Sequence, residues 1–257
     1  MKVVIFAGGK GTRISEESHL KPKPMIEIGG KPILWHIMKN YAAYGHNEFI
    51  ICCGYKGYVI KEYFYNYFLH NSDLSIDLSN NDITIHNSNA ENFKVTLVET
   101  GLETMTAGRL KRVQQYVGKE RFMLTYGDGL SNIDMHKQLQ YHEDKGVLCT
   151  MSIVQPGSRF GMIALDENNI VKDFAEKPKD DGTWINGGFF ICEPDTFDFL
   201  PDDSDDIMWE RAPLENLTKA GQLAAYRHSG FWKCMDTLRD NIDLNEMWEE
   251  NPKWKNW

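Results

Sequence analysis

Apolar runs and helix-like segments alternate along the first 155 residues of the chain. Short, uninterrupted apolar runs predict strands that are buried on both faces, and segments with apolar side chains every three or four residues predict helices between them. The strand-like runs are residues 3–6, 49–53, 95–98, 122–126 and 147–154. The helix-like segments are residues 33–44, 59–68, 134–145 and one that ends near residue 117. This alternation predicts a Rossmann-like α/β fold of three layers with a mostly parallel central sheet.

Two parts of the chain depart from this alternation. Residues 71–92 are rich in Asn, Asp and Ser, and their short alternating pieces predict a β-hairpin inserted into the fold. From residue 156 onward, short strands and turn-rich connections predict a smaller part that packs beside the sheet and forms the far wall of a pocket. Further helices are expected at residues 209–219 and 238–249. We therefore expect one domain over residues 1–257, with halves at residues 1–155 and 156–257.

The first predicted strand runs directly into a glycine-rich turn, AGGKGTR, at residues 7–13. Three glycines in four residues leave backbone N–H groups open to close approach by a phosphate. Arg13 and Lys23 follow with fixed positive charge, and Pro22 and Pro24 restrict the backbone on either side of Lys23. A buried strand that ends in such a turn predicts a nucleotide-phosphate site, and the alternative is a structural turn with a solvated basic cluster.

Two common nucleotide-binding motifs do not match this sequence. A P-loop needs Ser or Thr after its lysine, but Gly11 follows Lys10 and Pro32 follows Lys31. A dinucleotide fingerprint needs a third glycine where Ile14 stands. These mismatches disfavour a P-loop protein and an NAD-dependent oxidoreductase.

Two aspartates are candidate ligands of Mg²⁺. Asp128 lies between two glycines just past the predicted strand 122–126, where open α/β sheets place their ligands. Magnesium ions prefer one or two carboxylates together with phosphate oxygens and water. Asp236 is the candidate for the second carboxylate, although by sequence alone it is an equally good N-cap for a helix that begins near Leu238.

The composition narrows the class of partner. The chain has 257 residues and a net charge of −9, which disfavours binding to a nucleic-acid backbone. No apolar run is long enough to span a membrane, and the first residues lack the layout of a signal peptide. The five cysteines lie mostly in apolar runs, which favours reduced core thiols in a cytoplasmic protein and disfavours a zinc site. Trp254 and Trp257 would be exposed unless their segment docks, and with the hairpin they favour a homo-oligomer.

Several short motifs resemble those of the sugar-1-phosphate nucleotidyltransferases. They are GGKGTR at residues 8–13, KPKP at 21–24, GKP at 30–32, RFG at 159–161, EKP at 176–178 and NGG at 186–188. The resemblance covers nearly the whole chain and is closest to the branch of that family that uses CTP and glucose 1-phosphate. It implies the fold of the family and an Mg²⁺-dependent transfer of CMP to glucose 1-phosphate. The product, CDP-glucose, would serve the synthesis of deoxysugars for surface polysaccharide.

The resemblance also implies roles for individual residues. Arg13 and Lys23 would be catalytic, with Arg13 at the β- and γ-phosphates and Lys23 at the α-phosphate. The nucleotide would contact Ala7, Gly8, Gly9, Gly11, Thr12, Thr104, Met105, Thr106, Gly108, Arg109, Tyr126 and Gly127. The sugar phosphate would contact Gly161, Glu176, Lys177, Asn186, Gly187 and Gly188. Asp128 and Asp236 would bind Mg²⁺.

One position departs from the family pattern. The expected base-binding loop, residues 104–109, carries Ala107 where the family usually has glycine. The added methyl group is either harmless or narrows the pocket for the base, so the choice of nucleotide stays open. Two other hypotheses remain: transfer to a different phosphorylated acceptor, and a non-catalytic subunit that binds nucleotide sugars.

Overall fold

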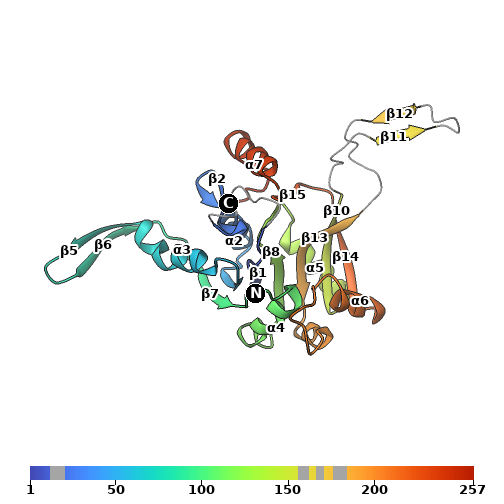
Figure 1. The fold of residues 1–257 in the computed structure, drawn as a ribbon, viewed down its shortest axis with the longest axis horizontal. Helices are drawn as coiled ribbons and strands as arrows, with labels where there is room; N and C mark the ends of the chain where they lie inside the picture. Colours follow the sequence, from blue (N-terminus) through green and yellow to red (C-terminus); the bar gives the residue numbers. More distant parts are fainter. Residues whose placement is uncertain (12–20, 156–161, 166–170, 176–183) are drawn as a thin grey trace.

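A seven-stranded sheet runs through the centre of the protein in the computed structural model (Figure 1), which describes residues 1–11, 21–155, 162–165, 171–175 and 184–257. The strand order is β14-β10-β13-β8-β1-β4-β7. These strands are β1 (Lys2–Phe6), β4 (Glu48–Cys53), β7 (Lys94–Glu99), β8 (Phe122–Tyr126), β10 (Cys149–Val154), β13 (Ile185–Cys192) and β14 (Leu223–His228). Among these seven strands only β13 is antiparallel to its neighbours. The predicted mostly parallel sheet is therefore confirmed.

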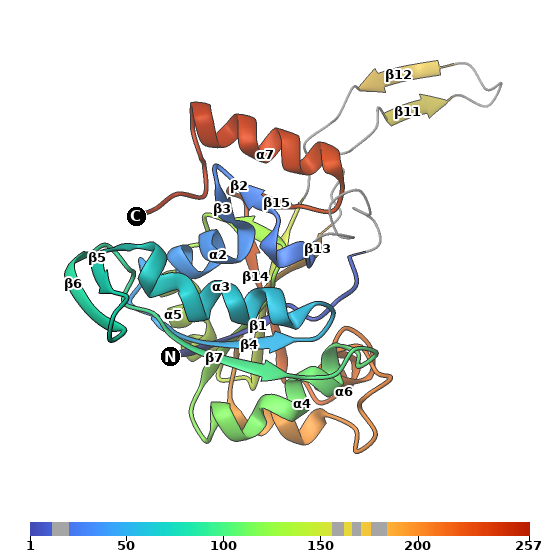
Figure 2. The same ribbon diagram turned by 60° about the vertical axis from the view of Figure 1, so that its left-hand side comes forward.

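Helices cover both faces of this sheet, which gives the expected three layers. The helices are α2 (Ile33–Ala42), α3 (Gly57–His70), α4 (Thr106–Val117), α5 (Met135–Lys145), α6 (Ala212–Lys219) and α7 (Leu238–Glu250), with short 3₁₀ turns η2 (Lys23–Met25) and η3 (Pro194–Phe199). Figure 2 shows α2 and α3 on one side of the sheet and α4 and α6 on the other. No described helix is both long enough and apolar enough to cross a membrane.

Four two-stranded ribbons in the described part of the chain are added to this framework. They are β2 (Glu27–Ile28) with β3 (Lys31–Pro32), β5 (Ser72–Asp77) with β6 (Asp82–Ser88), β9 (Gly129–Ser131) with β15 (Trp232–Cys234), and β11 (Met162–Leu165) with β12 (Val171–Ala175). All four pairs are antiparallel.

The first strand shows why its sequence is apolar without interruption. Val3 and Ile5 pack into the core on the side of α2 and α3, whereas Val4 and Phe6 pack into the core on the side of α4 and α6. Successive side chains of a strand point to opposite faces, and both faces of β1 are covered by helices. The prediction of a strand buried on both faces is correct.

The edge of the sheet that forms the site lies where the strand order reverses. β4 lies on one side of β1 and β8 on the other, and both are parallel to it. At such a switch point the loops that follow neighbouring strands diverge and leave a crevice beyond the carboxyl ends of the strands. These loops are residues 7–11 after β1 and residues 127–128 after β8. The crevice therefore lies between the glycine-rich turn and Asp128.

Two elements of the second half differ from the sequence expectation. β13 does not pack beside the sheet but lies inside it, between β10 and β8. The predicted helix 209–219 begins only at Ala212, because Pro213 has no N–H to donate to the carbonyl group of Trp209 and its ring would clash with that group inside a helix. The strand β14 was not predicted. The division of the chain into two halves remains a prediction.

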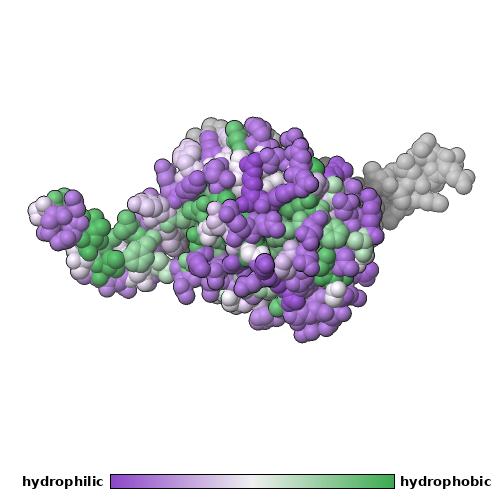
Figure 3. All heavy atoms as spheres, turned by 90° about the horizontal axis from the view of Figure 1, so that it is seen from below, coloured by the Kyte–Doolittle hydropathy of each residue, from purple (hydrophilic) through white to green (hydrophobic). Residues whose placement is uncertain are grey.

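The β5–β6 hairpin is exposed, whereas the C-terminal segment packs against the body of the protein. The hairpin of β5 and β6 projects from the body beyond α3 (Figure 1), and hydrophobic surface runs along this arm (Figure 3). By contrast, Trp254 is completely buried and stacks near Trp248 and Phe231. The C-terminal segment therefore docks on its own chain, and Trp254 gives no support to a homo-oligomer.

Candidate active site

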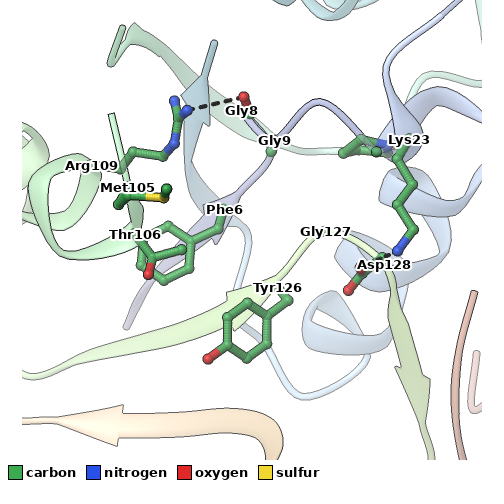
Figure 4. Close-up of a pocket in the computed structure, with 13 residues that line it drawn as sticks. Phe6, Gly8, Gly9, Lys23, Met105, Thr106, Arg109, Tyr126, Gly127 and Asp128 are labelled. Carbon is green, nitrogen blue, oxygen red and sulfur yellow. Dashed lines mark hydrogen bonds and ion pairs between the residues drawn. The ribbon is translucent and has the colours of Figure 1, made fainter. Parts of the chain in front are cut away.

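A cavity of about 320 Å³ opens at the switch point of the sheet (Figure 4). It is lined by the turn after β1, the start of α4, and the end of β8 with the loop that follows it. The lining residues are Phe6, Ala7, Gly8, Gly9, Gly11, Lys23, Pro24, Met105, Thr106, Arg109, Tyr126, Gly127 and Asp128. Figure 4 shows Lys23 and Asp128 at one end and Met105, Thr106 and Arg109 at the other. We call the end with the Lys23–Asp128 ion pair the charged end; the opposite end is built on α4.

The glycine-rich turn is held in place by a buried arginine. The guanidinium of Arg109 donates to Gly8 O at 3.0 Å, Gly101 O at 2.9 Å, Cys53 O at 3.2 Å and Thr100 Oγ1 at 2.7 Å. A Cβ atom on Gly8 would lie 2.0 Å from Arg109 Nη1, so this close approach requires glycine. Burial lowers the pKa of Arg109. Arg109 therefore joins three loops around the cavity, which fits a role in shaping the site.

The charged end contains a three-residue ion cluster. Lys23 Nζ lies 2.6 Å from Asp128 Oδ2 and 2.7 Å from Asp236 Oδ1. Burial alone would lower the pKa of Lys23, but the neighbouring carboxylate of Asp128 and the hydrogen bonds to both aspartates raise it above its usual range. Lys23 is therefore a permanent cation at the end of the cavity that is distant from α4. Lys21, by contrast, pairs with Glu27 at the surface, at 2.7 Å.

The structure decides between the two interpretations of Asp236. The N-cap of α7 is Thr237, whose hydroxyl accepts from the backbone N–H of Asp240, and the side chain of Asp240 accepts from the backbone of Thr237 in return. Asp236 is thus not the helix cap. It immediately precedes the cap, and its carboxylate contacts Lys23.

The aspartates form a donor set that suits a hard divalent cation. Among the described residues, ligand atoms of Asp128, Asp236 and Cys234 lie within 4.8 Å of one another. Carboxylate oxygens are the ligands that Mg²⁺ prefers, and Asp128 and Asp236 each contribute a carboxylate here. Burial raises the pKa of the Cys234 thiol, so this group stays protonated and is a poor ligand for magnesium. The residues present therefore fit Mg²⁺ on the two carboxylates.

The opposite end of the cavity is built on the first turn of α4. Met105 and Thr106 line the cavity there. Ala107 is fully buried in the core on the side of α4 and α6, so its methyl group does not face the cavity. Thr104 and Gly108 also lie behind the wall, and a Cβ atom on Gly108 would come within 2.8 Å of the Asp205 backbone. Of the two alternatives for Ala107, its burial favours the harmless methyl group.

The wall expected to bind the sugar lies next to Tyr126. Asn186 Nδ2 donates to the Tyr126 hydroxyl at 3.4 Å, and Asn186 Oδ1 accepts from Gly188 N at 2.9 Å. Gly187 O accepts from Trp232 Nε1 at 2.8 Å. The NGG segment is thus adjacent to the cavity. The remaining predicted site residues lie outside the described part of the chain; they are Thr12, Arg13, Gly161, Glu176 and Lys177.

Some residues around the cavity were not identified from the sequence. Phe6 and Pro24 line it, and Glu210 forms hydrogen bonds with Tyr126 and Thr106. Phe6 is the last residue of β1, so its position at a strand end was the available signal. Glu210 lies in an acidic segment that is far from both partners in the chain, and no local pattern singles it out.

The fold and the cavity define a class of protein. A family model described as nucleotidyl transferase matches residues 2–250, and the chain belongs to that family. Within it, the chain is 51% identical to the glucose-1-phosphate cytidylyltransferase of Salmonella typhi over the full length of both chains. It is 47% identical to a probable glucose-1-phosphate cytidylyltransferase of Bacillus subtilis, again over the full length of both.

A solved structure agrees at the level of the fold. A putative glucose-1-phosphate thymidylyltransferase from Bacillus anthracis, crystallised with sucrose, superposes with a TM-score of 0.70 at 16% sequence identity. The match covers 100% of this chain and 97% of that one. The nucleotidyltransferase fold expected from the sequence motifs is thereby confirmed.

Proposed function

We propose that this protein transfers CMP from CTP to α-D-glucose 1-phosphate and releases CDP-glucose and pyrophosphate. The observation that carries this proposal is one cavity that joins Lys23 and Asp128 to a glycine turn and the first turn of α4, with Asp236 paired to Lys23 beside it. The full-length identity with glucose-1-phosphate cytidylyltransferases supports the choice of substrates.

The proposed reaction is an in-line displacement at the α-phosphorus of CTP. A phosphate oxygen of glucose 1-phosphate forms a bond to that phosphorus while the bond to the bridging oxygen of pyrophosphate breaks. The pyrophosphate leaves with the electron pair, and no covalent intermediate with the protein is needed. The main task of the site is therefore to align the two reactants and to stabilise negative charge.

Individual residues have distinct tasks in this proposal. The backbone of the glycine turn holds the triphosphate, and Lys23 stabilises charge that develops at the α-phosphate. Asp128 and Asp236 would hold Mg²⁺, which when bound supplies neutralising charge to the phosphate oxygens. We also propose that Arg13 contacts the β- and γ-phosphates. Glu176 and Lys177 would contact the sugar phosphate.

Pyrophosphate release with different nucleotides tests this function. CTP, UTP, dTTP and ATP are each combined with glucose 1-phosphate and Mg²⁺, and we expect turnover with CTP. Lys23→Ala and Asp128→Ala should each lower kcat by at least about a hundredfold, because each removes a charge from the charged end of the cavity. Lys21→Ala is the matched control, since the described structure pairs Lys21 with Glu27 at the surface.

The other outcomes of this experiment are equally informative. Turnover with UTP or dTTP in place of CTP would contradict the cytidylyl assignment but keep the chemistry. No turnover with any triphosphate would contradict the proposed reaction and favour a different acceptor or a non-catalytic nucleotide-sugar-binding subunit.

We further propose that the protein is a homo-oligomer that uses the β5–β6 hairpin as a subunit contact. Ile76 and Ile83 are cross-strand partners on this hairpin and are 51% and 53% exposed. A two-stranded hairpin is marginally stable alone in water, so a covered apolar face would stabilise it. The cytoplasmic location inferred from the sequence remains a prediction.

A further inference from the structure

Behind the wall of the cavity lies a carboxylate that joins two of its lining residues. Glu210 Oε1 accepts a hydrogen bond from the Tyr126 hydroxyl, and Glu210 Oε2 accepts one from Thr106 Oγ1 at 3.0 Å. Both hydroxyl-bearing residues line the cavity (Figure 4), but Glu210 itself does not. Within the described residues, the Glu210 side chain therefore reaches the cavity through Tyr126 and Thr106.

The hydrogen-bond directions around the two hydroxyls require an acceptor at position 210. Thr106 Oγ1 already accepts from Trp209 N at 2.7 Å, and the Tyr126 oxygen already accepts from Asn186 Nδ2 at 3.4 Å. A hydroxyl has a single proton, and both protons point to Glu210. An ionised carboxylate accepts both, whereas an amide of the same size offers only one oxygen.

The backbone around Glu210 also fixes the start of α4. Met105 N donates to Asp205 O at 2.6 Å and Ala107 N donates to Ile207 O at 3.0 Å. Residues 205–210, which we call the bracing segment, thus satisfy N–H groups that the helix itself cannot pair. The bracing segment places Glu210 at a defined position relative to Thr106.

The same network reaches the wall expected to bind the sugar. Asn186 donates to Tyr126 and accepts from Gly188 N at 2.9 Å, and a Cβ atom on Gly188 would lie 2.5 Å from the Tyr126 ring. Tyr126 is therefore held between Glu210 on one side and the β13 backbone on the other. Its ring position depends on both contacts.

We propose that Glu210 is a positioning residue for the nucleoside triphosphate, because it fixes Thr106 and Tyr126 in the geometry that the nucleotide binds. This inference rests on the proposed function, since it assumes that the cavity takes a pyrimidine nucleoside triphosphate. Glu210 makes no contact with the reacting phosphates in this proposal. Its loss should weaken nucleotide binding more than it slows the chemical step.

Substitution Glu210→Gln tests the proposal with little change in size. One of the two hydroxyl protons loses its acceptor, so we expect the KM and the calorimetric Kd for CTP to rise about tenfold, with kcat changed by less than about threefold. KM for glucose 1-phosphate should change less than KM for CTP. Asp206→Asn is the matched control, because Asp206 lies in the same segment and its side chain is exposed.

A double substitution separates positioning from a loss of general stability. Tyr126→Phe removes one hydroxyl proton, so the single amide oxygen that Glu210→Gln introduces can then serve Thr106 alone. We therefore expect the double variant to bind CTP about as well as Tyr126→Phe alone, rather than with the product of the two losses. A variant that merely destabilised the fold would not be rescued by a second substitution in the same network.

Two results would overturn the role of Glu210. One is a Kd for CTP in Glu210→Gln within about twofold of the wild type, and the other is a double variant whose losses multiply. The single variants and the double variant are compared by their Kd for CTP alone. Absence of turnover in the wild type would therefore count against the proposed function and not against the positioning role.

Discussion

At the scale of single residues, Lys23 takes the place between Asp128 and Asp236 where a divalent cation would bind. Its ammonium lies within 2.7 Å of an oxygen from each aspartate. Two cations at the same carboxylates repel each other, so a metal ion and Lys23 in this conformation compete. In the proposed reaction, a Lys23 side chain displaced from the aspartates would be available to the phosphate of the nucleotide.

This competition predicts an unusual effect of Lys23→Ala. In nucleotide-free protein the variant should bind Mn²⁺, used as a probe for Mg²⁺, about tenfold more tightly than the wild type, because the aspartates have lost their internal partner. Free Mn²⁺ measured by electron paramagnetic resonance gives the Kd, with Lys21→Ala as the control. Equal or weaker binding by Lys23→Ala would show that the lysine does not block the metal site.

Gly8 and Gly9 are neighbouring glycines of the turn that differ in the space available for a side chain. A Cβ atom on Gly8 would lie 2.0 Å from Arg109, whereas a Cβ atom on Gly9 would have nothing described within 4 Å. We expect Gly8→Ala to destabilise the protein by about 1–3 kcal/mol through overpacking, and Gly9→Ala to leave the free energy of unfolding nearly unchanged. Urea unfolding followed by fluorescence measures the free energy of unfolding of both variants. Equal destabilisation would contradict the close packing of Arg109 against Gly8.

At the scale of elements, the sequence predicts those helices and strands whose limits depend on nearby residues. The uninterrupted apolar run at residues 3–6 predicts a strand covered on both faces, and helices do cover both faces of β1. The start of α6 at Ala212 was placed three residues too early, because the apolar spacing from residue 209 was followed and Pro213, which favours the first turn of a helix, was not used. Asp236 looked like a helix cap because Thr237, the actual cap, is its neighbour.

The contact between α2 and the C-terminal segment is expected to depend on pH. His36 is buried, donates through Nε2 to Ile28 O at 2.8 Å, and accepts through Nδ1 from Trp254 Nε1 at 3.4 Å. A second proton on this ring would face the Trp254 N–H, and burial lowers the pKa of His36 to about 4. The nearby cation Lys255 also acts to lower this pKa.

The sign of the pH effect follows from this lowered pKa. Below about pH 6.5 the unfolded chain takes up a proton that folded His36 does not accept until about pH 4, so stability falls as the pH falls through this window. The loss is roughly 3 kcal/mol at most. His46, whose pKa is also lowered to about 4, adds to the slope of the wild type.

Comparison with His36→Gln isolates the contribution of His36. The variant cannot titrate, so we expect its free energy of unfolding to fall less steeply than that of the wild type between pH 6.5 and 4. Urea unfolding at several pH values gives both curves. Parallel curves would contradict the assignment of this pH dependence to His36.

At the scale of the whole molecule, the β5–β6 hairpin predicts association of subunits. Ile83→Asp places a charge on the apolar face of the hairpin and should shift the protein toward the 29.7 kDa monomer in sedimentation velocity. Ile242→Asp on α7 is the control, because Ile242 is 49% exposed, close to the 53% of Ile83. A monomeric wild type at micromolar concentration would contradict the proposed oligomer.

The candidate site also shows which part of a site a sequence can predict. Short segments of the sequence were enough to single out the glycine turn, Lys23 and Asp128. The structure brings all three to one cavity. Glu210 acts through hydrogen bonds to residues that are distant in the chain, and only the folded chain reveals them. Sequence reasoning therefore finds groups at strand ends more readily than the residues that support them.

The position of β13 inside the sheet has a consequence for how the protein is made. β8 pairs with β1 on one edge and with residues 190–192 of β13 on the other, and Asp236 and Trp254 arrive later still. A nascent chain that has left the ribosome only up to residue 155 would therefore expose an unpaired edge of β8 and an uncovered apolar face. The charged end of the cavity can then complete its folding only after the C-terminus is released. The risk of aggregation is therefore greatest while the chain is being synthesised.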